Sequence, residues 1–185
     1  MTVHDKELAK QVILEIVRQA GGVLNYKTSL YKAFYHAHLK FAESQVGYLS
    51  NWPIVRMPRG PGIDRFDMLL GELLAEAAVE SHQIECGDYV GFQFRLGRGA
   101  PRRNVLPAGA IEAIAHGVEQ IAGKSAKQAS DDSHAMSRAW REASDGEELN
   151  IYTDLLDAEQ YSARKQHSSS IASALREVWD QVPTR

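Results

Sequence analysis

The chain has 185 residues, of which 44% are hydrophobic and 24% are charged, and these are the values of an ordinary globular protein. We therefore expect one domain with a long terminal element, large enough to bury a sizeable core. The net charge of −3 excludes the strongly basic composition by which many proteins bind nucleic acid. Cys86 is the single cysteine, which excludes a disulfide framework and a zinc site built on cysteines.

The hydropathy of the chain predicts a cytoplasmic protein. Residues 1–20 carry too many charges for a secretion signal, and no apolar run reaches the roughly 18 residues that a membrane helix needs. A cytoplasmic location also agrees with the lack of paired cysteines. We expect no membrane association.

Helical periodicity defines the beginning of the chain. A first helix is predicted from Lys6 to Ala20, and Gly21-Gly22 ends it because glycine adopts the left-handed conformation found at helix ends. A second helix starts near Tyr26, with Asn25 as its N-cap. This helix is apolar around more than half of its circumference, which indicates a central position in the fold.

A short strand, a turn, a third helix and a hairpin are predicted next. Residues 52–57 read as a strand, and residues 58–62 hold two prolines and two glycines, which is typical of a turn. Asp64 is predicted to cap a third helix that extends to Ala78. Residues 79–85 and 89–96 alternate in part between apolar and polar, which predicts a β-hairpin. This order of elements is that of a winged-helix unit.

The second half of the chain is predicted to be helical after a basic, glycine-rich loop over residues 96–104. A fourth helix spans residues 107–122, and its core stripe consists of Ile111, Ile114, Val118 and Ile121. A short helix follows over residues 125–133. Residues 141–157 are acidic, and a last helix covers much of residues 154–181, with the serine run 168–170 as a point where it breaks.

Three motifs occur in an order that composition alone does not produce. The second helix carries the first motif, the segment around the predicted strand and turn carries the second, and the short helix with its following turn carries the third. Their residues are Leu30, Lys32, Phe34, Tyr35 and Ala37; Trp52, Gly60 and Pro61; and Ser130, Ser133, His134, Ala139 and Trp140. Together they resemble the SocA-like antitoxin family, also called the Panacea domain, over roughly residues 24–157.

The corresponding family segments read Lys-Leu-x-Lys-Leu-Leu-Tyr-Phe-Ala, Tyr-Gly-Pro-Val, Leu-Ser-x-x-Thr-His and Pro-Trp. The first motif is somewhat diverged in this chain, and in the later motifs Arg59 precedes the glycine, Gly62 follows the proline, Ser133 replaces threonine and Ala139 replaces proline. The resemblance implies that the motif residues shape the domain. They are Tyr31, Lys32, Tyr35, Trp52, Gly60, Pro61, Ser133, His134 and Trp140.

The resemblance implies a bacterial or phage-associated protein that binds and neutralises a toxin protein encoded by a neighbouring gene. One prototype of the family resembles a proteolytic adaptor that delivers its toxin for degradation. The mechanism would be stoichiometric binding, so we expect no enzyme activity and no cofactor.

Exposed arginines provide the predicted partner-binding surface. They lie near the Gly-Pro turn and in the basic loop, and they are Arg56, Arg59, Arg98, Arg102 and Arg103. If the two groups converge, they would bind an anionic partner, either an acidic protein surface or nucleic acid. The alternative function is therefore a winged-helix DNA-binding regulator. The third helix would then be the recognition helix, but its acidic residues, Asp67, Glu72 and Glu76, suit a major groove poorly.

His134 is the leading candidate for chemistry. Asp131 lies three residues earlier on the same helix face, and this pair supports a third interpretation, a metal-dependent enzyme. We prefer a histidine that caps the helix end, because no second convergent group is evident. His36 and His38 point about 200° apart on a helix, so we expect no shared metal, with His36 in solvent.

These observations predict an α+β fold that is mainly α-helical, with a winged-helix-like core, a small antiparallel β element and a C-terminal helical extension. The predicted domain covers residues 1–157, including the N-terminal helix, and the extension covers residues 158–185. An apolar stripe on the extension would pack either on the domain or against a second copy. It consists of Ile171, Leu175, Val178 and Trp179.

Overall fold

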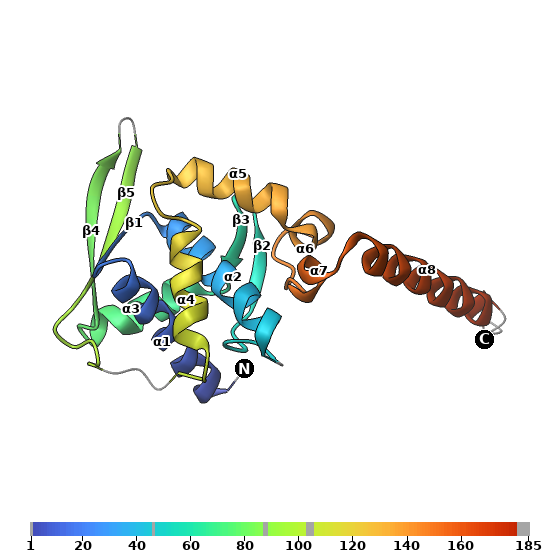
Figure 1. Cartoon of the computed structure of the whole chain (residues 1–185), viewed down its shortest axis with the longest axis horizontal. Helices are drawn as coiled ribbons and strands as arrows, with labels where there is room; N and C mark the ends of the chain where they lie inside the picture. Colours follow the sequence, from blue (N-terminus) through green and yellow to red (C-terminus); the bar gives the residue numbers. More distant parts are fainter. Residues whose placement is uncertain (1, 46, 87–88, 103–105, 181–185) are drawn as a thin grey trace. The chain divides into compact units, whose positions relative to one another are not determined.

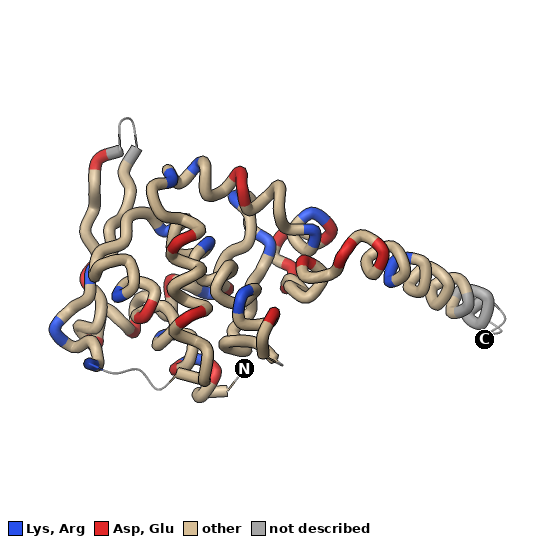
Figure 2. The backbone as a smooth tube through the Cα atoms, viewed as in Figure 1, with Lys and Arg blue, Asp and Glu red and all other residues tan. Residues whose placement is uncertain are grey.

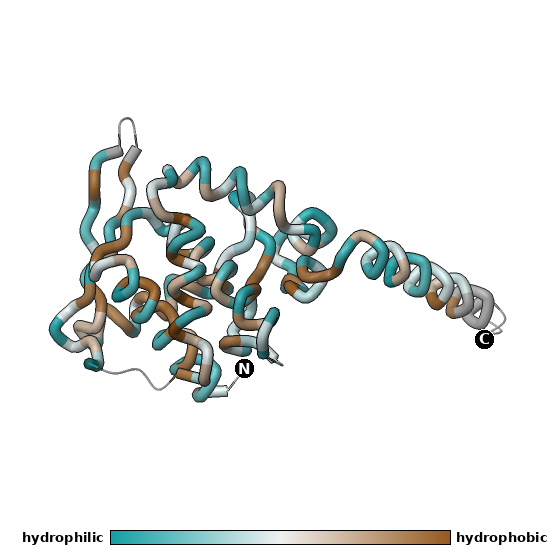
Figure 3. The backbone as a smooth tube through the Cα atoms, in the orientation of Figure 1, coloured by the Kyte–Doolittle hydropathy of each residue, from teal (hydrophilic) through white to brown (hydrophobic). Residues whose placement is uncertain are grey.

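The computed structural model describes residues 2–45, 47–86, 89–102 and 106–180 of the chain (Figure 1). The fold is α+β and mainly α-helical, with small antiparallel sheets, as predicted. The chain divides into two compact units, Met1–Asp154 and Leu155–Arg185. Hydrophobic segments gather in the helices of the first unit (Figure 3).

The first helix, α1 (Val3–Gln19), begins three residues earlier than predicted. Thr2 and Asp5 form a reciprocal capping box, which satisfies the backbone N–H groups at the helix start. Gly21 and Gly22 end the helix at φ +80° and +83°, as expected of glycine in the left-handed region. The buried face of α1 includes Val12, Ile16 and Val17, which are fully inaccessible to solvent.

A strand that the sequence did not reveal, β1 (Val23–Asn25), precedes α2 (Lys27–Ser44). The predicted cap Asn25 is wrong, because it lies in β1 and the N-cap is Tyr26, at φ +70° and without a side-chain capping bond. The predicted central position of α2 is confirmed: Ala33, Phe34, Tyr35 and Ala37 are all fully buried.

The predicted strand over residues 52–57 forms as β2 (Ile54–Met57), but the predicted turn over 58–62 is only partly correct. Residues Gly60–Ile63 form a second strand, β3, which pairs antiparallel with β2, so only Pro58 and Arg59 make the turn. On its other edge, β2 bonds a later segment, since the Leu149 N–H donates to the Ile54 carbonyl oxygen over 2.7 Å.

The third helix, α3 (Phe66–Ala75), does not have Asp64 as its cap. Arg65 is the N-cap, in a left-handed conformation at φ +44°, and the Asp64 carboxylate accepts a hydrogen bond from the Arg65 side chain. The predicted hairpin is confirmed as β4 (Val79–Cys86) and β5 (Tyr89–Leu96). The sheet order is β1-β5-β4, and with α1, α2 and α3 this gives a winged-helix-like core into which β2 and β3 are inserted.

The helices of the second half are α4 (Ala110–Glu119), α5 (Ala126–Met136), α6 (Arg138–Glu142), α7 (Tyr152–Leu155) and α8 (Ala158–Asp180). Ile111 was predicted in the core of α4 but is 48% exposed, because Ala110, Ala113, Ile114 and Gly117 form the buried face. In the second unit, the serine run 168–170 does not break α8, which is continuous from Ala158 to Asp180; the Ser170 hydroxyl donates to the Gln166 carbonyl one turn earlier.

Candidate functional site

Some residues from each of the three sequence motifs meet at one place in the first unit. The Lys32 ammonium of α2 donates to the Pro61 carbonyl oxygen of β3 over 2.8 Å. A Cβ atom added to Gly60 would lie 2.5 Å from Ser133 Oγ and 2.7 Å from Lys32 Nζ. Segments from three parts of the sequence therefore form one contact cluster, which we call the Lys32 cluster: Lys32, Gly60, Pro61, Ser133 and His134.

Gly60 is required in the Lys32 cluster for two physical reasons. Its φ of +93° lies in the region that residues with a side chain rarely adopt. Its α-carbon also faces Ser133 and Lys32 so closely that a methyl group has no space. Ser133 is fully buried, and its hydroxyl donates to the Ser130 carbonyl oxygen. The cluster therefore fixes α5 against the start of β3.

Lys32 is an unusual residue because its side chain is buried without a counter-charge. Its exposed fraction is 1%, and among the described residues no carboxylate pairs with it. Burial lowers the pKa of Lys32 to about 7, since an ammonium group is poorly stabilised away from water. A lysine with such a pKa can act as a nucleophile or base, but a substrate would have to reach an atom that solvent does not.

His134 stacks on Trp140, and the predicted capping role is wrong. The ring centroids are 3.9 Å apart with an interplanar angle of 8°. Helix α5 continues to Met136, and its last carbonyls accept hydrogen bonds from Arg141 instead, at 3.0 Å for His134 and 2.7 Å for Ala135. Burial lowers the pKa of His134 and the charge of Lys32 lowers it further, while Asp131 and a backbone hydrogen bond of Arg59 oppose this.

The proposed metal pair of His134 and Asp131 finds no support in the side-chain contacts. Asp131 pairs with Lys127 over 2.5 Å, and His134 Nε2 is buried without a hydrogen-bond partner. Within the described ranges, no group of three or more His, Cys, Asp or Glu residues could hold a metal ion. His36 was expected in solvent but is 6% exposed, and burial lowers the pKa of His36 and of His38 to about 4.

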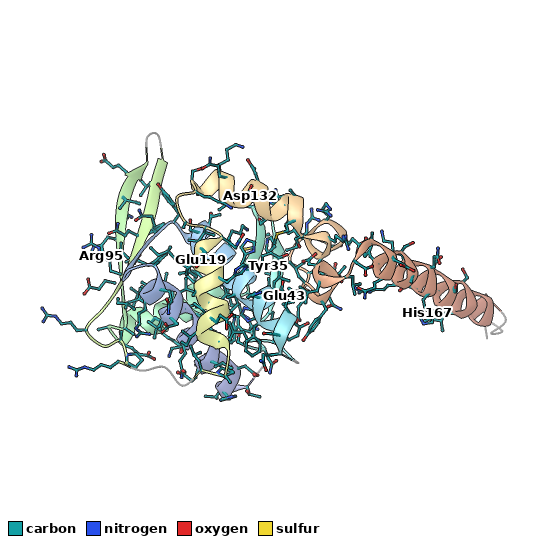
Figure 4. The ribbon with its side chains drawn as sticks, in the orientation of Figure 1. Tyr35, Glu43, Arg95, Glu119, Asp132 and His167 are labelled. Atoms are coloured by element: carbon teal, nitrogen blue, oxygen red, sulfur yellow. The ribbon has the colours of Figure 1, made fainter. Side chains whose placement is uncertain are left out.

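Asp154 is a site residue that sequence reasoning missed. Its carboxylate accepts hydrogen bonds from the Tyr35 hydroxyl at 2.7 Å, the Ser137 hydroxyl at 2.8 Å and the Ala139 N–H at 2.9 Å. Burial raises the pKa of Tyr35, whose side chain lies inside the first unit in Figure 4. Asp154 thus joins α2 to the start of α6, and no local motif marks it.

A groove of about 440 Å³ lies beside the Lys32 cluster. It is lined by residues 26–28 and 31 at the start of α2, by residues 57–60 of β2, β3 and their turn, by residues 90–92 of β5, and by Ala126. We call it the β5 groove. Gly60 belongs to both, because it lines the groove and lies against Lys32.

The predicted partner-binding arginines do not form one surface. Arg59 lines the β5 groove near residues 90–92, whereas Arg98 follows the far end of β5, about 20 Å further along the strand. Arg102 is exposed in the same loop as Arg98, and Arg103 lies outside the described residues. Figure 2 shows Lys and Arg distributed over the first unit with Asp and Glu between them.

Arg56 has a role in packing rather than at the surface. Its guanidinium donates to the carbonyl oxygens of Trp140 and Ala143, both at 2.8 Å, and pairs with Asp145 at 2.9 Å. The guanidinium carbon lies 4.5 Å from the centre of the Trp140 ring, a cation–π distance. Arg59 differs, because its side chain has no hydrogen bond or ion pair among the described residues.

No protein family, curated protein or solved structure matches the chain. No helix in the described part of the chain is long and apolar enough to cross a membrane.

Proposed function

We propose that the chain is a non-catalytic protein-binding module of the SocA-like antitoxin kind, which captures a partner toxin protein encoded by a neighbouring gene. The observation that carries the proposal is the contrast between the Lys32 cluster and the β5 groove, which share Gly60. In the cluster, Lys32 and Ser133 are buried and hold three segments together. The groove is open, and it is lined by apolar side chains and by Arg59, whose side chain has no partner among the described residues.

The chemistry of the groove favours binding over catalysis. Its lining includes Tyr26, Tyr31, Met57 and Phe92, which offer apolar contact area, together with Lys27 and Arg59. Recognition sites typically combine such apolar walls with a few polar groups that fix orientation. We also propose a cytoplasmic location, which the single cysteine supports.

The test is co-expression of the full chain with the product of the adjacent gene. We expect the two proteins to purify as a stable complex of defined stoichiometry, and the neighbour to be toxic when expressed alone. The matched variants are Arg59→Glu, which reverses charge in the groove, and Arg98→Glu, which makes the same change beyond β5. Absence of both a complex and toxicity would refute the proposal.

A second candidate function is DNA binding, and the strand order β1-β5-β4 favours it because this is the sheet of a winged helix. The charges on α3 argue against it. Asp67 pairs with Lys27 over 2.5 Å, and Glu72 pairs with Lys6 over 2.8 Å. A recognition helix with acidic side chains repels phosphate. A steep salt dependence of binding to the chain's own upstream DNA would support this candidate, and no binding at low salt would exclude it.

A further inference from the structure

The edge of β5 is covered along only part of its length. Strand β1 pairs with residues 93–95 of β5 and ends at Asn25. The Tyr26 N–H still donates to the Phe92 carbonyl oxygen over 2.7 Å, and the chain then turns into α2. The chain leaves the sheet at Tyr26, whose φ is positive at +70°.

The backbone of Val90 faces the side that β1 leaves open. The carbonyl of Phe92 and the N–H of Leu96 both bond the β1 segment, through Tyr26 and Gly22. Backbone groups of alternate residues point to the same edge of a strand, so the N–H and C=O of Val90 point to the edge of Phe92 and Leu96. Among the described residues, no strand pairs with Val90 on that side. A strand edge of this kind is a template for another chain.

The β5 groove lies along this open edge. Val90, Gly91 and Phe92 form one wall, and the turn between β2 and β3 forms another. The side chains of Val90 and Phe92 are 59% and 41% exposed although both are apolar. Exposed apolar side chains next to an unpaired strand edge are the features by which extended peptides are bound, since the backbone bonds give affinity and the pockets give specificity.

The charge of the groove selects the partner. Its lining includes Lys27 and Arg59 but no Asp or Glu. Lys27 pairs with Asp67, whose side chain is 84% exposed, whereas Arg59 has no ion pair among the described residues. The hydroxyl groups of Thr28 and Tyr31 add polar atoms at the start of α2. An acidic side chain in the groove would meet a complementary charge.

We propose that the β5 groove binds an extended segment of a partner protein that adds a strand to β5 at Val90 and places an acidic side chain beside Arg59. This inference rests on the proposed function as a protein-binding module and names the form of the partner segment. A second copy of this chain fits less well, because a two-fold strand pair would bring Lys27 and Arg59 of each copy together. The outer edge of β4 is also a poorer site, since Glu80, Ser81, His82 and Gln83 make that strand polar on both faces.

The first experiment uses random dodecapeptides displayed on phage as the probe and the full chain as the target. We expect enrichment of peptides in which apolar residues alternate around an Asp or Glu. Selected peptides are then synthesised with N-methyl groups on the amides of alternate residues. One of the two methylation patterns should weaken binding about tenfold, because it removes the bonds to Val90, and the other should not. Absence of enriched peptides, or equal affinity for both patterns, would overturn the inference.

The second experiment tests the groove from the side of the protein. We expect Arg59→Glu to weaken binding of the selected acidic peptide about tenfold, whereas Arg98→Glu, with the same change of charge, should alter it less than about twofold. Val90→Pro removes the N–H at the open edge, where proline is tolerated, and should abolish binding while circular dichroism shows a folded chain. Equal affinities of the two arginine variants would contradict the proposed position of the acidic side chain.

The two proposals fail in distinguishable ways. If the neighbouring gene product binds the wild-type chain and the Arg59 and Val90 variants equally, the protein-binding function stands and strand addition to β5 is wrong. If no neighbour binds but displayed peptides require Val90 and Arg59, the groove binds extended segments and the antitoxin function is wrong.

Discussion

Replacement of Gly60 by alanine is the sharpest test of the Lys32 cluster. The added methyl group would lie 2.5 Å from Ser133 Oγ and 2.7 Å from Lys32 Nζ, so both side chains must move. A non-glycine residue at φ +93° costs about 1–2 kcal/mol in backbone strain. Overpacking of a buried site adds about 1–3 kcal/mol. We therefore expect the free energy of unfolding to fall by about 2–5 kcal/mol, a large share of the ~5–15 kcal/mol typical of a domain.

Urea unfolding followed by tryptophan fluorescence measures this change, and Gly123→Ala is the matched control. Gly123 has a φ of +70° but no heavy atom within 4 Å of an added Cβ, so only backbone strain applies. The difference between the two variants isolates the steric part. Adding Ser133→Ala to Gly60→Ala should restore part of the loss, because the nearest atom is removed. Equal destabilisation by Gly60→Ala and Gly123→Ala would refute the packing of the cluster.

Three further predictions concern buried polar groups. The pKa of Lys32 is about 7 in the folded chain and ordinary in the unfolded one, so from pH 7 to about 10 the unfolded state binds more protons and the free energy of unfolding rises with pH. Lys32→Met should remove about 1.4 kcal/mol per pH unit from that slope, measured by urea unfolding. An unchanged slope would contradict the burial of Lys32. Asp154→Ala leaves the Tyr35 and Ser137 hydroxyls and the Ala139 N–H without their acceptor, so it should lower the free energy of unfolding by about 3 kcal/mol or more. The expected losses are about 1 kcal/mol for Tyr35→Phe and under about 0.5 kcal/mol for Asp145→Ala at an exposed position. Equal losses for the three variants in thermal unfolding would refute the anchoring role of Asp154. His36 and His38 have pKa values lowered to about 4, so both imidazoles should stay neutral at pH 5 in NMR titrations. The free energy of unfolding should fall as the pH drops from 6.5 towards 4, because the unfolded state then binds more protons. A proton bound by His38 at pH 6 would be incompatible with its burial.

Periodicity predicted the helices and the β4–β5 hairpin, but it failed where the start of an element depends on distant contacts. Asn25 and Asp64 have side chains suited to capping, yet α2 and α3 begin after Tyr26 and Arg65, which both have positive φ angles. These conformations arise where the chain leaves a strand segment, which a local rule for capping side chains does not describe. Strand β3 was hidden for a related reason: glycine and proline read as a turn, and only the pairing with β2 makes them a strand.

The candidate site was predictable in part. The motif residues Lys32, Gly60, Ser133 and His134 do meet, although their separation in sequence gives no indication of a shared cluster. Arg59 was singled out for its charge, and its place in the β5 groove depends on where β1 ends. Arg56 was given the same role, but its hydrogen bonds to Trp140 and Ala143 can be read only from the folded chain. Asp154 was missed because its partners are distributed over α2 and α6.

The hydrogen bond between Tyr35 and Asp154 also bears on how the protein is made. The two residues are 119 positions apart, and a ribosome adds about 5–20 residues per second. Helix α2 therefore emerges on the order of ten seconds before the carboxylate that accepts the hydrogen bond of the Tyr35 hydroxyl. By then α4 is synthesised and can cover α2, but the Tyr35 hydroxyl lacks its acceptor, and the incomplete first unit stays accessible to chaperones and proteases. Completion of the first unit is thus set by the pace of translation, and a chain released before Asp154 is synthesised would be a substrate for degradation.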